Sequence, residues 1–249
     1  MKIALLFLSI SAVTVFAQDD YAALVKRGDQ LDAQLKTKEA LAIYLEAEKL
    51  QPDSANLLHR IAKQYGESQN DVASKEEKLS IGMKALDYSK RAVAADPKNS
   101  MAQLALAVSY GRVTPYLDNK TKVSYSRLVK EHADKARELD SSGNDLVYHV
   151  LGAWNYELAN LNPVLRAIAQ VVYGKLPSAS NEAAVENFKK ATELNPKRLA
   201  NFVELGRSYA AMGKKTEARA ALEKGLSLPN AQRDDPETKA RGRAALKKL

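Results

Sequence analysis

Small and aromatic residues recur along the chain at a fixed spacing that ends in proline. Two copies of this pattern with identical spacing are Ala40, Tyr44, Ala47, Pro52 and Ala184, Phe188, Ala191, Pro196. Side chains three and four positions apart share one face of a helix, and alanines on that face allow a neighbouring helix to approach closely. A proline then ends the helix. The pattern predicts the second helix of a repeated helix-turn-helix unit.

The positions that precede each copy extend the pattern over a first helix and resemble a tetratricopeptide repeat, which has a period of about 34 residues. In the first copy the earlier positions of that repeat are filled by Gly28 and Leu31. Near the far end, the pattern returns at Phe202, Leu205, Gly206, Tyr209, Ala218, Leu222 and Gly225. These matches predict an all-α helical solenoid.

The repeats in the middle of the chain are longer than this period. Successive second helices are predicted to end at Pro52, Pro97, Ser141, Pro196 and Asn230. The extra residues are predicted between the first and second helices of the middle three repeats, near 67–82, 113–125 and 160–181. We expect about five repeats, insertions gathered on one rim of the solenoid, and a C-terminal capping helix beyond Pro236.

The N-terminal residues 1–17 are predicted to be a secretory signal peptide. Lys2 precedes an apolar run from Ile3 to Val15, and small residues lead to a predicted cleavage site after Ala17. The run is short for a membrane span, which needs about 20 residues. We therefore expect export, periplasmic or secreted, with residues 18–249 as one repeat domain. Retention of the segment as a membrane anchor is the alternative.

Composition and motifs argue against catalysis. The chain has no cysteine, so disulfides and thiolate sites are excluded. It has no phosphate-binding glycine loop and no nucleophile elbow, and its three histidines, His59, His132 and His149, lack metal-site spacing. We expect no enzyme activity, cofactor, metal or nucleic-acid partner. The formal net charge of +8 is compatible with an acidic partner.

Candidate binding residues are those that the repeat frame places on the inner face of each first helix. They are His59, Lys63, Leu104, Val108, Arg112, His149, Tyr156, Val203 and Arg207. Their mixture of basic and apolar side chains is suited to an acidic peptide, a carboxylate, or a lipid phosphate with its acyl chain. The alternative is that the charges are solvated or pair with carboxylates such as Glu67 and Glu157.

The longest insertion contains an apolar face at helical spacing. It consists of Val164, Leu165, Ile168, Val171 and Val172. This segment is either extra helix packed on the solenoid or an apolar lip that touches a lipid, a membrane surface or a partner.

Several longer runs resemble one known family. They are 57–62 (LLHRIA), Gly111-Arg112, 130–136 (KEHADKA), 156–160 (YELAN) and 177–180 (PSAS). Together with the insertions, they resemble the regulator of microtubule dynamics family over roughly residues 22–228. The resemblance implies a tetratricopeptide-like fold and a non-catalytic role in binding partners, which in animal relatives is associated with microtubules, mitochondria and organelle contacts.

The predicted export signal sets the chain apart from those relatives, so we expect a bacterial-type exported member. The leading hypothesis is a scaffold that binds a protein or peptide. The alternatives are binding of a lipid or other amphiphile in the concave groove, and an intracellular microtubule-associated regulator if the N-terminus does not direct export.

Overall fold

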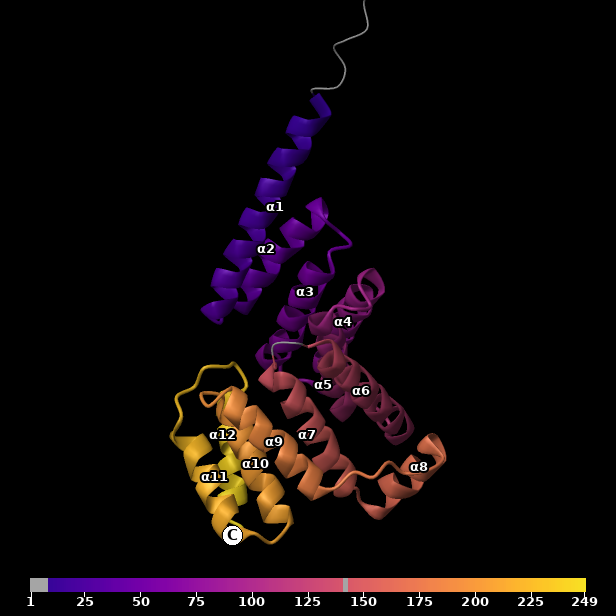
Figure 1. Ribbon diagram of the computed structural model, residues 1–249, viewed down its shortest axis with the longest axis vertical. Helices are drawn as coiled ribbons and strands as arrows, with labels where there is room; N and C mark the ends of the chain where they lie inside the picture. Colours follow the sequence, from indigo (N-terminus) through magenta and orange to yellow (C-terminus); the bar gives the residue numbers. More distant parts are fainter. Residues whose placement is uncertain (1–8, 141–142) are drawn as a thin grey trace, which may run out of the picture.

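The computed structural model describes residues 9–140 and 143–249, and ten of the helices in this part form five antiparallel pairs stacked into a curved solenoid (Figure 1). The pairs are α1 (Ser9–Ala33) with α2 (Thr37–Leu50), α3 (Ala55–Ser68) with α4 (Lys75–Ala95), α5 (Ser100–Val113) with α6 (Asn119–Leu139), α7 (Asp145–Ala159) with α9 (Asn181–Leu194), and α10 (Leu199–Ala211) with α11 (Lys215–Ser227). The predicted all-α solenoid of about five repeats is confirmed. Residues 1–8 of the predicted signal peptide, and the predicted helix end at Ser141, lie outside the described residues.

The recurring small and aromatic residues are the contacts that hold each pair together. Ala40, Tyr44 and Ala47 are fully buried in α2, and their counterparts in α9 are equally buried. In the first repeat a β-carbon on Gly28 would lie within 2.6 Å of Cδ1 of the Tyr44 ring. The residue at this position of α1 must therefore lack a side chain, because the aromatic ring of the second helix fills the space.

Polar residues define where most of the first helices begin. Ser54, Asn99 and Asn144 precede α3, α5 and α7, and each side chain accepts a hydrogen bond from a backbone N–H in the first turn. Such caps satisfy donors that have no partner within the helix. The starts of the repeats are thus set by local chemistry as well as by packing.

The three insertions take two forms. The first two each add a short 3-10 turn, η1 (Gln69–Asp71) and η2 (Thr114–Tyr116), and lengthen the following helix, so that α4 and α6 have 21 residues each. The third forms a separate helix, α8 (Pro163–Tyr173). These segments contact one another in succession: η2 touches α4, and α8 packs on α6. The insertions therefore share one edge of the solenoid, as the sequence predicted.

The C-terminal end is covered by α12 (Asp235–Leu246), which packs on α10 and α11 and confirms the predicted capping helix. The segment before it, 228–234, loops back toward the lower end of α1 (Figure 1, yellow). Within the described ranges, no helix has the length and apolar character needed to cross a membrane.

Candidate functional site

The inner face of the solenoid is formed by the first helices of the repeats, α1, α3, α5, α7 and α10. Seven of the nine candidate residues are exposed or half-buried there: His59, Lys63, Val108, Arg112, His149, Tyr156 and Arg207. They are spread over four helices and do not converge on a single point. Any binding surface that they form is therefore elongated along the stack.

Two of the apolar candidates are not on this surface. Leu104 is 1% exposed and packs in a cluster with Ala133 and Val147 of the adjoining helices. Val203 is fully buried with Leu199 and Leu222, because α11 and α12 pack on this side of α10. The expectation that these two residues line the groove is wrong: both belong to the core.

The three basic candidates already have partners. Lys63 lies 2.6 Å from a carboxylate oxygen of Asp32 and 3.8 Å from one of Glu67. The ion pair with Glu67 is the alternative that the sequence left open. Arg112 donates a hydrogen bond of 2.9 Å to the carbonyl of Gly66.

Arg207 is held between two repeats. Its guanidinium lies 2.5 Å from a carboxylate oxygen of Glu204 and stacks over the Tyr156 ring, 4.8 Å from the centroid. Burial raises the pKa of the nearby Glu157 carboxyl, and the charge of Arg207 opposes that shift. The basic residues of the inner face thus stabilise contacts between neighbouring helices, which leaves them less available to a ligand.

An open groove of about 750 Å³ lies between α1 and α3 and reaches the start of α5. We call it the N-terminal groove; its lining includes Tyr21, Lys26, Asp29, Asn56, His59, Arg60 and Met101. Among these, Lys26 and Asn56 are exposed, and Met101 is 41% exposed. The groove therefore offers a cation, an amide and a flexible apolar side chain on one surface.

Side chains in the middle of this groove are held by hydrogen bonds. Asp29 accepts a hydrogen bond of 2.7 Å from the Tyr44 hydroxyl and one of 2.8 Å from Nε of Arg60. Burial opposes ionisation, yet these hydrogen bonds and the charge of Arg60 hold the pKa of Asp29 below its usual value. Burial, with a further contribution from Arg60, lowers the pKa of His59 to about 4. His59 is therefore neutral at pH 7.

Of the lining residues, the sequence had singled out only His59 as a candidate. Arg60 is adjacent to it, and Asn56 and Met101 occupy the same position of the second and third repeats, four residues after Pro52 and Pro97. The repeat period alone shows that Asn56 and Met101 occupy equivalent positions. It does not show that both side chains are exposed in one groove, because that depends on how α3 and α5 are rotated against each other.

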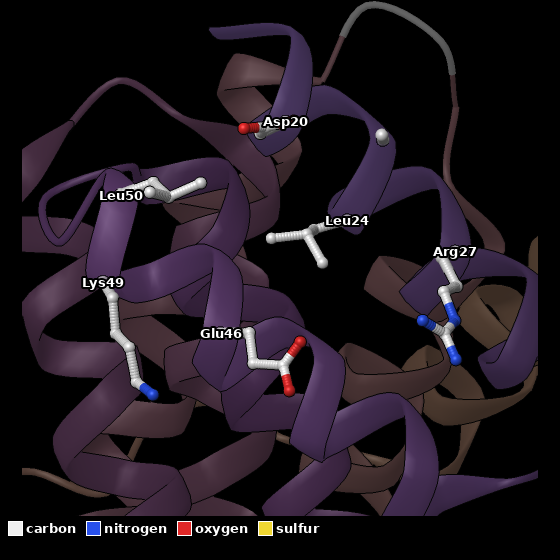
Figure 2. Close-up of a pocket in the computed structure, with 7 residues that line it drawn as sticks. Asp20, Leu24, Arg27, Glu46, Lys49 and Leu50 are labelled. Carbon is white, nitrogen blue, oxygen red and sulfur yellow. The ribbon is translucent and has the colours of Figure 1, made fainter. Parts of the chain in front are cut away.

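A second hollow, of about 440 Å³, lies on the outer side of the first repeat, between α1 and α2. Figure 2 shows Leu24 between the charged side chains of Arg27, Glu46 and Lys49. All of its lining residues belong to α1 and α2, so this hollow is a shallow space between the two helices of the first repeat.

The other two histidines take part in contacts between helices. Nδ1 of His132 lies 2.8 Å from the side-chain oxygen of Gln103, and Nδ1 of His149 lies 2.8 Å from that of Asn201. Because each partner atom can only accept, each Nδ1 carries the proton. Burial lowers the pKa of both histidines. The described part of the chain contains no group of three or more His, Asp or Glu side chains that could hold a metal ion.

The five residues of the candidate apolar lip all lie on α8, but they do not share one environment. Val164 and Val171 are 63% and 85% exposed, whereas Leu165, Ile168 and Val172 are half-buried. The neighbouring Ala169 is fully buried. The apolar face of α8 is thus wider than the part that packs on the solenoid.

The segment 228–234, here named the C-terminal bridge, joins the two ends of the stack. Arg233 donates to the carbonyl of Leu35 at 3.4 Å and to the Thr37 hydroxyl at 3.2 Å, and it forms an ion pair with Asp71 of η1. Asp235 anchors the base of the bridge by accepting hydrogen bonds from the backbone N–H groups of Ala231 and Gln232. The bridge thus connects the C-terminal end of the chain to the first two repeats.

Comparisons with known proteins identify both the sequence family and the fold. Residues 24–249 match the sequence profile described as regulator of microtubule dynamics protein 1-3. The chain is 28% identical to regulator of microtubule dynamics protein 1 of Mus musculus over 226 residues, which cover 90% of this chain and 73% of the mouse protein. It is 26% identical to regulator of microtubule dynamics protein 3 of Xenopus laevis, covering 88% of this chain and 48% of that protein. The chain therefore spans about three quarters of one relative and about half of the other.

Solved structures show the same fold at lower identity. A thermophilic TPR protein of Thermus thermophilus, TTC0263, superposes with a TM-score of 0.63 at 19% identity, covering 91% of this chain and 98% of that one. PilF of Pseudomonas aeruginosa superposes with a TM-score of 0.52 at 14% identity, covering 94% and 93%. These likenesses support a tetratricopeptide-type solenoid.

Proposed function

The chain belongs to the regulator of microtubule dynamics family, and on that premise we propose that it is a non-catalytic scaffold that binds an extended segment of a protein in its N-terminal groove. The observation that carries this proposal is the groove itself, about 750 Å³ of open space on the inner face of three successive repeats. Solenoids of this kind use such extended concave surfaces for binding.

The side chains that line the groove can bind the charged, main-chain and apolar groups of a peptide. The exposed ammonium of Lys26 can pair with an acidic side chain or a terminal carboxylate, and the Asn56 amide can hydrogen-bond to a main chain. Met101 supplies an apolar contact that adapts to the shape of its partner. Behind these residues, Asp29 and Arg60 neutralise each other, so they fix the shape of the groove while Lys26 gives it its charge.

The same contacts argue against catalysis. A catalytic residue needs a reactive group within reach of a base and open to a substrate. Here Asp29 is held ionised by Arg60 and Tyr44, and the pKa of His59 is lowered to about 4 by burial. Neither group is placed to exchange protons with a ligand near pH 7.

Binding of a lipid in the concave groove is less well supported. That hypothesis needed the apolar side chains of Leu104, Val108 and Val203 beside the basic ones. Leu104 and Val203 are buried in the core, so Val108 alone remains on the inner face. Two of the three apolar side chains on which the lipid hypothesis relied are therefore not available to an acyl chain.

A matched pair of variants tests the proposal. Lys26→Glu with Met101→Asp alters the groove, whereas Lys197→Glu with Met83→Asp makes the same chemical changes elsewhere; Met83 and Met101 are each 41% exposed. We expect the wild type and the control to retain the same partner from a native extract and the groove variant to lose it. Equal retention by all three proteins would exclude the groove as the binding site.

We also propose that the protein is exported, periplasmic or secreted, with cleavage after Ala17. The support is the basic start, the apolar run and the small residues before the cleavage site. N-terminal sequencing of the native protein tests it: a chain that begins at Gln18 supports export. A chain that keeps residues 1–17 and stays in the cell would instead favour the alternative of an intracellular microtubule-associated regulator.

A further inference from the structure

The edge of α8 that faces away from the solenoid is apolar. Val164 and Val171 are 63% and 85% exposed, and Ala167 between them is exposed as well. Residues at positions i, i+3 and i+7 of a helix lie on one side, so these three side chains form a continuous stripe. The opposite side holds α8 in place through the fully buried Ala169 and through the Tyr173 hydroxyl, which lies 3.3 Å from Oγ of Ser126 in α6.

The segments around this stripe carry only positive charge between Asp118 and Glu131 and between Glu157 and Glu182. No Asp or Glu occurs in 119–130, the first half of α6, or in 159–181, which contains α8; the basic residues of these two segments are Lys120, Lys122, Arg127, Lys130, Arg166 and Lys175. One of them, Lys130, is paired with Asp134. This concentration is local, because α2, α3 and α4 each contain both acidic and basic residues.

We propose that this α8 surface, the apolar stripe with its surrounding basic side chains, docks on an anionic lipid membrane. The valines enter the boundary between headgroups and acyl chains, and the lysines and arginines meet lipid phosphates. A stripe of small aliphatic side chains suits a lipid surface better than a protein, whose binding hot spots are enriched in Trp, Tyr and Arg. The surface is distinct from the N-terminal groove, so a bound peptide and a membrane can be held at the same time.

Co-sedimentation of the full chain with vesicles tests this inference. We expect binding to vesicles of phosphatidylcholine mixed with an equal part of phosphatidylglycerol, weak binding to phosphatidylcholine alone, and a decrease with added salt. Val164→Asp with Val171→Asp, and separately Arg166→Glu with Lys175→Glu, should each weaken binding at least about tenfold. Every protein compared has the same N-terminus, either with the run from Ile3 to Val15 or cleaved after Ala17, so any contribution of that run is the same in all.

Two controls match these changes. Leu50→Asp with Met83→Asp alters two other exposed apolar residues, and Lys247→Glu with Lys248→Glu makes the same change in net charge on the C-terminal side; both should bind within about twofold of the wild type. Equal binding to the two kinds of vesicle, or α8 variants that bind like the wild type, would overturn the proposal. So would retention on immobilised polyglutamate without binding to vesicles, since the surface would then fit an acidic polypeptide.

A second measurement does not depend on loss of binding. The chain has no cysteine, so Val171→Cys gives a single site for an environment-sensitive dye. The dye at position 171 should shift to shorter wavelength when anionic vesicles are added, and the same dye on Met83→Cys should not. Identical spectra at position 171 with and without vesicles would contradict insertion of α8.

Discussion

Arg233 forms an ion pair with Asp71, a residue 162 positions earlier in the chain. The contact joins the bridge before α12 to the turn after α3. Through Leu35 and Thr37, Arg233 also holds the junction between α1 and α2. Arg233 thus ties the two ends of the solenoid together, and we expect the curvature of the stack to depend on it.

Removing this contact should loosen the solenoid. Because Arg233 and Asp71 are 23% and 22% exposed, Arg233→Ala should reduce the free energy of unfolding by about 1 to 2 kcal/mol. Hydrogen exchange in residues 228–234 should become faster, and the radius of gyration in small-angle scattering should rise. Arg243→Ala, at an exposed position of α12, is the control. If both variants behave like the wild type, the bridge does not set the curvature.

The repeating alanines predict a second result. Ala47 and Ala191 are fully buried at equivalent positions of α2 and α9. Leucine at either position overfills a close contact between helices and should cost about 1 to 3 kcal/mol of stability. Denaturant unfolding measures the effect, with Ala42→Leu on the exposed side of α2 as the control, expected within about 0.5 kcal/mol of the wild type. An unchanged midpoint for both core variants would mean that the repeat frame is misplaced.

Two glycines in helices should respond to alanine with opposite signs. At Gly28 the added β-carbon meets the Tyr44 ring, which is fully buried and fixed by its hydrogen bond to Asp29; we expect a loss of about 1 to 3 kcal/mol. At Gly111 no atom lies within 4 Å of the added carbon, and removing the flexibility of glycine should add about 0.5 to 1 kcal/mol. Thermal unfolding of the two variants compares them directly. A stabilising effect at Gly28 would contradict the close α1–α2 contact, and a destabilising effect at Gly111 would contradict the open space around it.

His59 should make the protein sensitive to acid. Its pKa is lowered from 6.5 to about 4 in the folded state, so the unfolded chain binds more protons between these values. Stability is therefore complete above about pH 6.5 and falls as the pH is lowered toward 4. In His59→Gln this contribution is absent, and the stability lost between pH 7 and pH 5 should shrink, on the order of 1 kcal/mol after solvent screening. An equal loss in both proteins would contradict the burial of His59 in the groove.

Much of the architecture could be read from the sequence because it rests on local chemistry. Pro52, Pro97 and Pro196 mark the ends of three second helices, and the buried alanines mark their contact faces. The positions of the insertions could be predicted by comparing the spacing of successive helix ends with the period of about 34 residues. The secondary structure of the insertions could not be predicted: residues 163–173 form a separate helix, while the other two insertions lengthen α4 and α6.

The site was harder to predict because exposure on the inner face depends on how successive repeats rotate against one another. Leu104 and Val203 occupy inward positions of the frame, yet neighbouring helices cover them. The Arg233–Asp71 contact also has no local signal, since it arises only when the whole superhelix has formed. Arg60 was missed for a simpler reason: it lies beside an inward position of α3 and reaches the groove through its length.

The most direct test of the central claim, that the N-terminal groove binds a protein segment, is photo-cross-linking in a native extract. A photoreactive amino acid placed at position 101 lies in the groove, and one at position 83 lies outside it at the same 41% exposure. We predict a discrete cross-linked partner from position 101, absent from position 83 and lost when Lys26→Glu is added. The same adducts from both positions, or none from position 101 in a folded protein, would contradict the account.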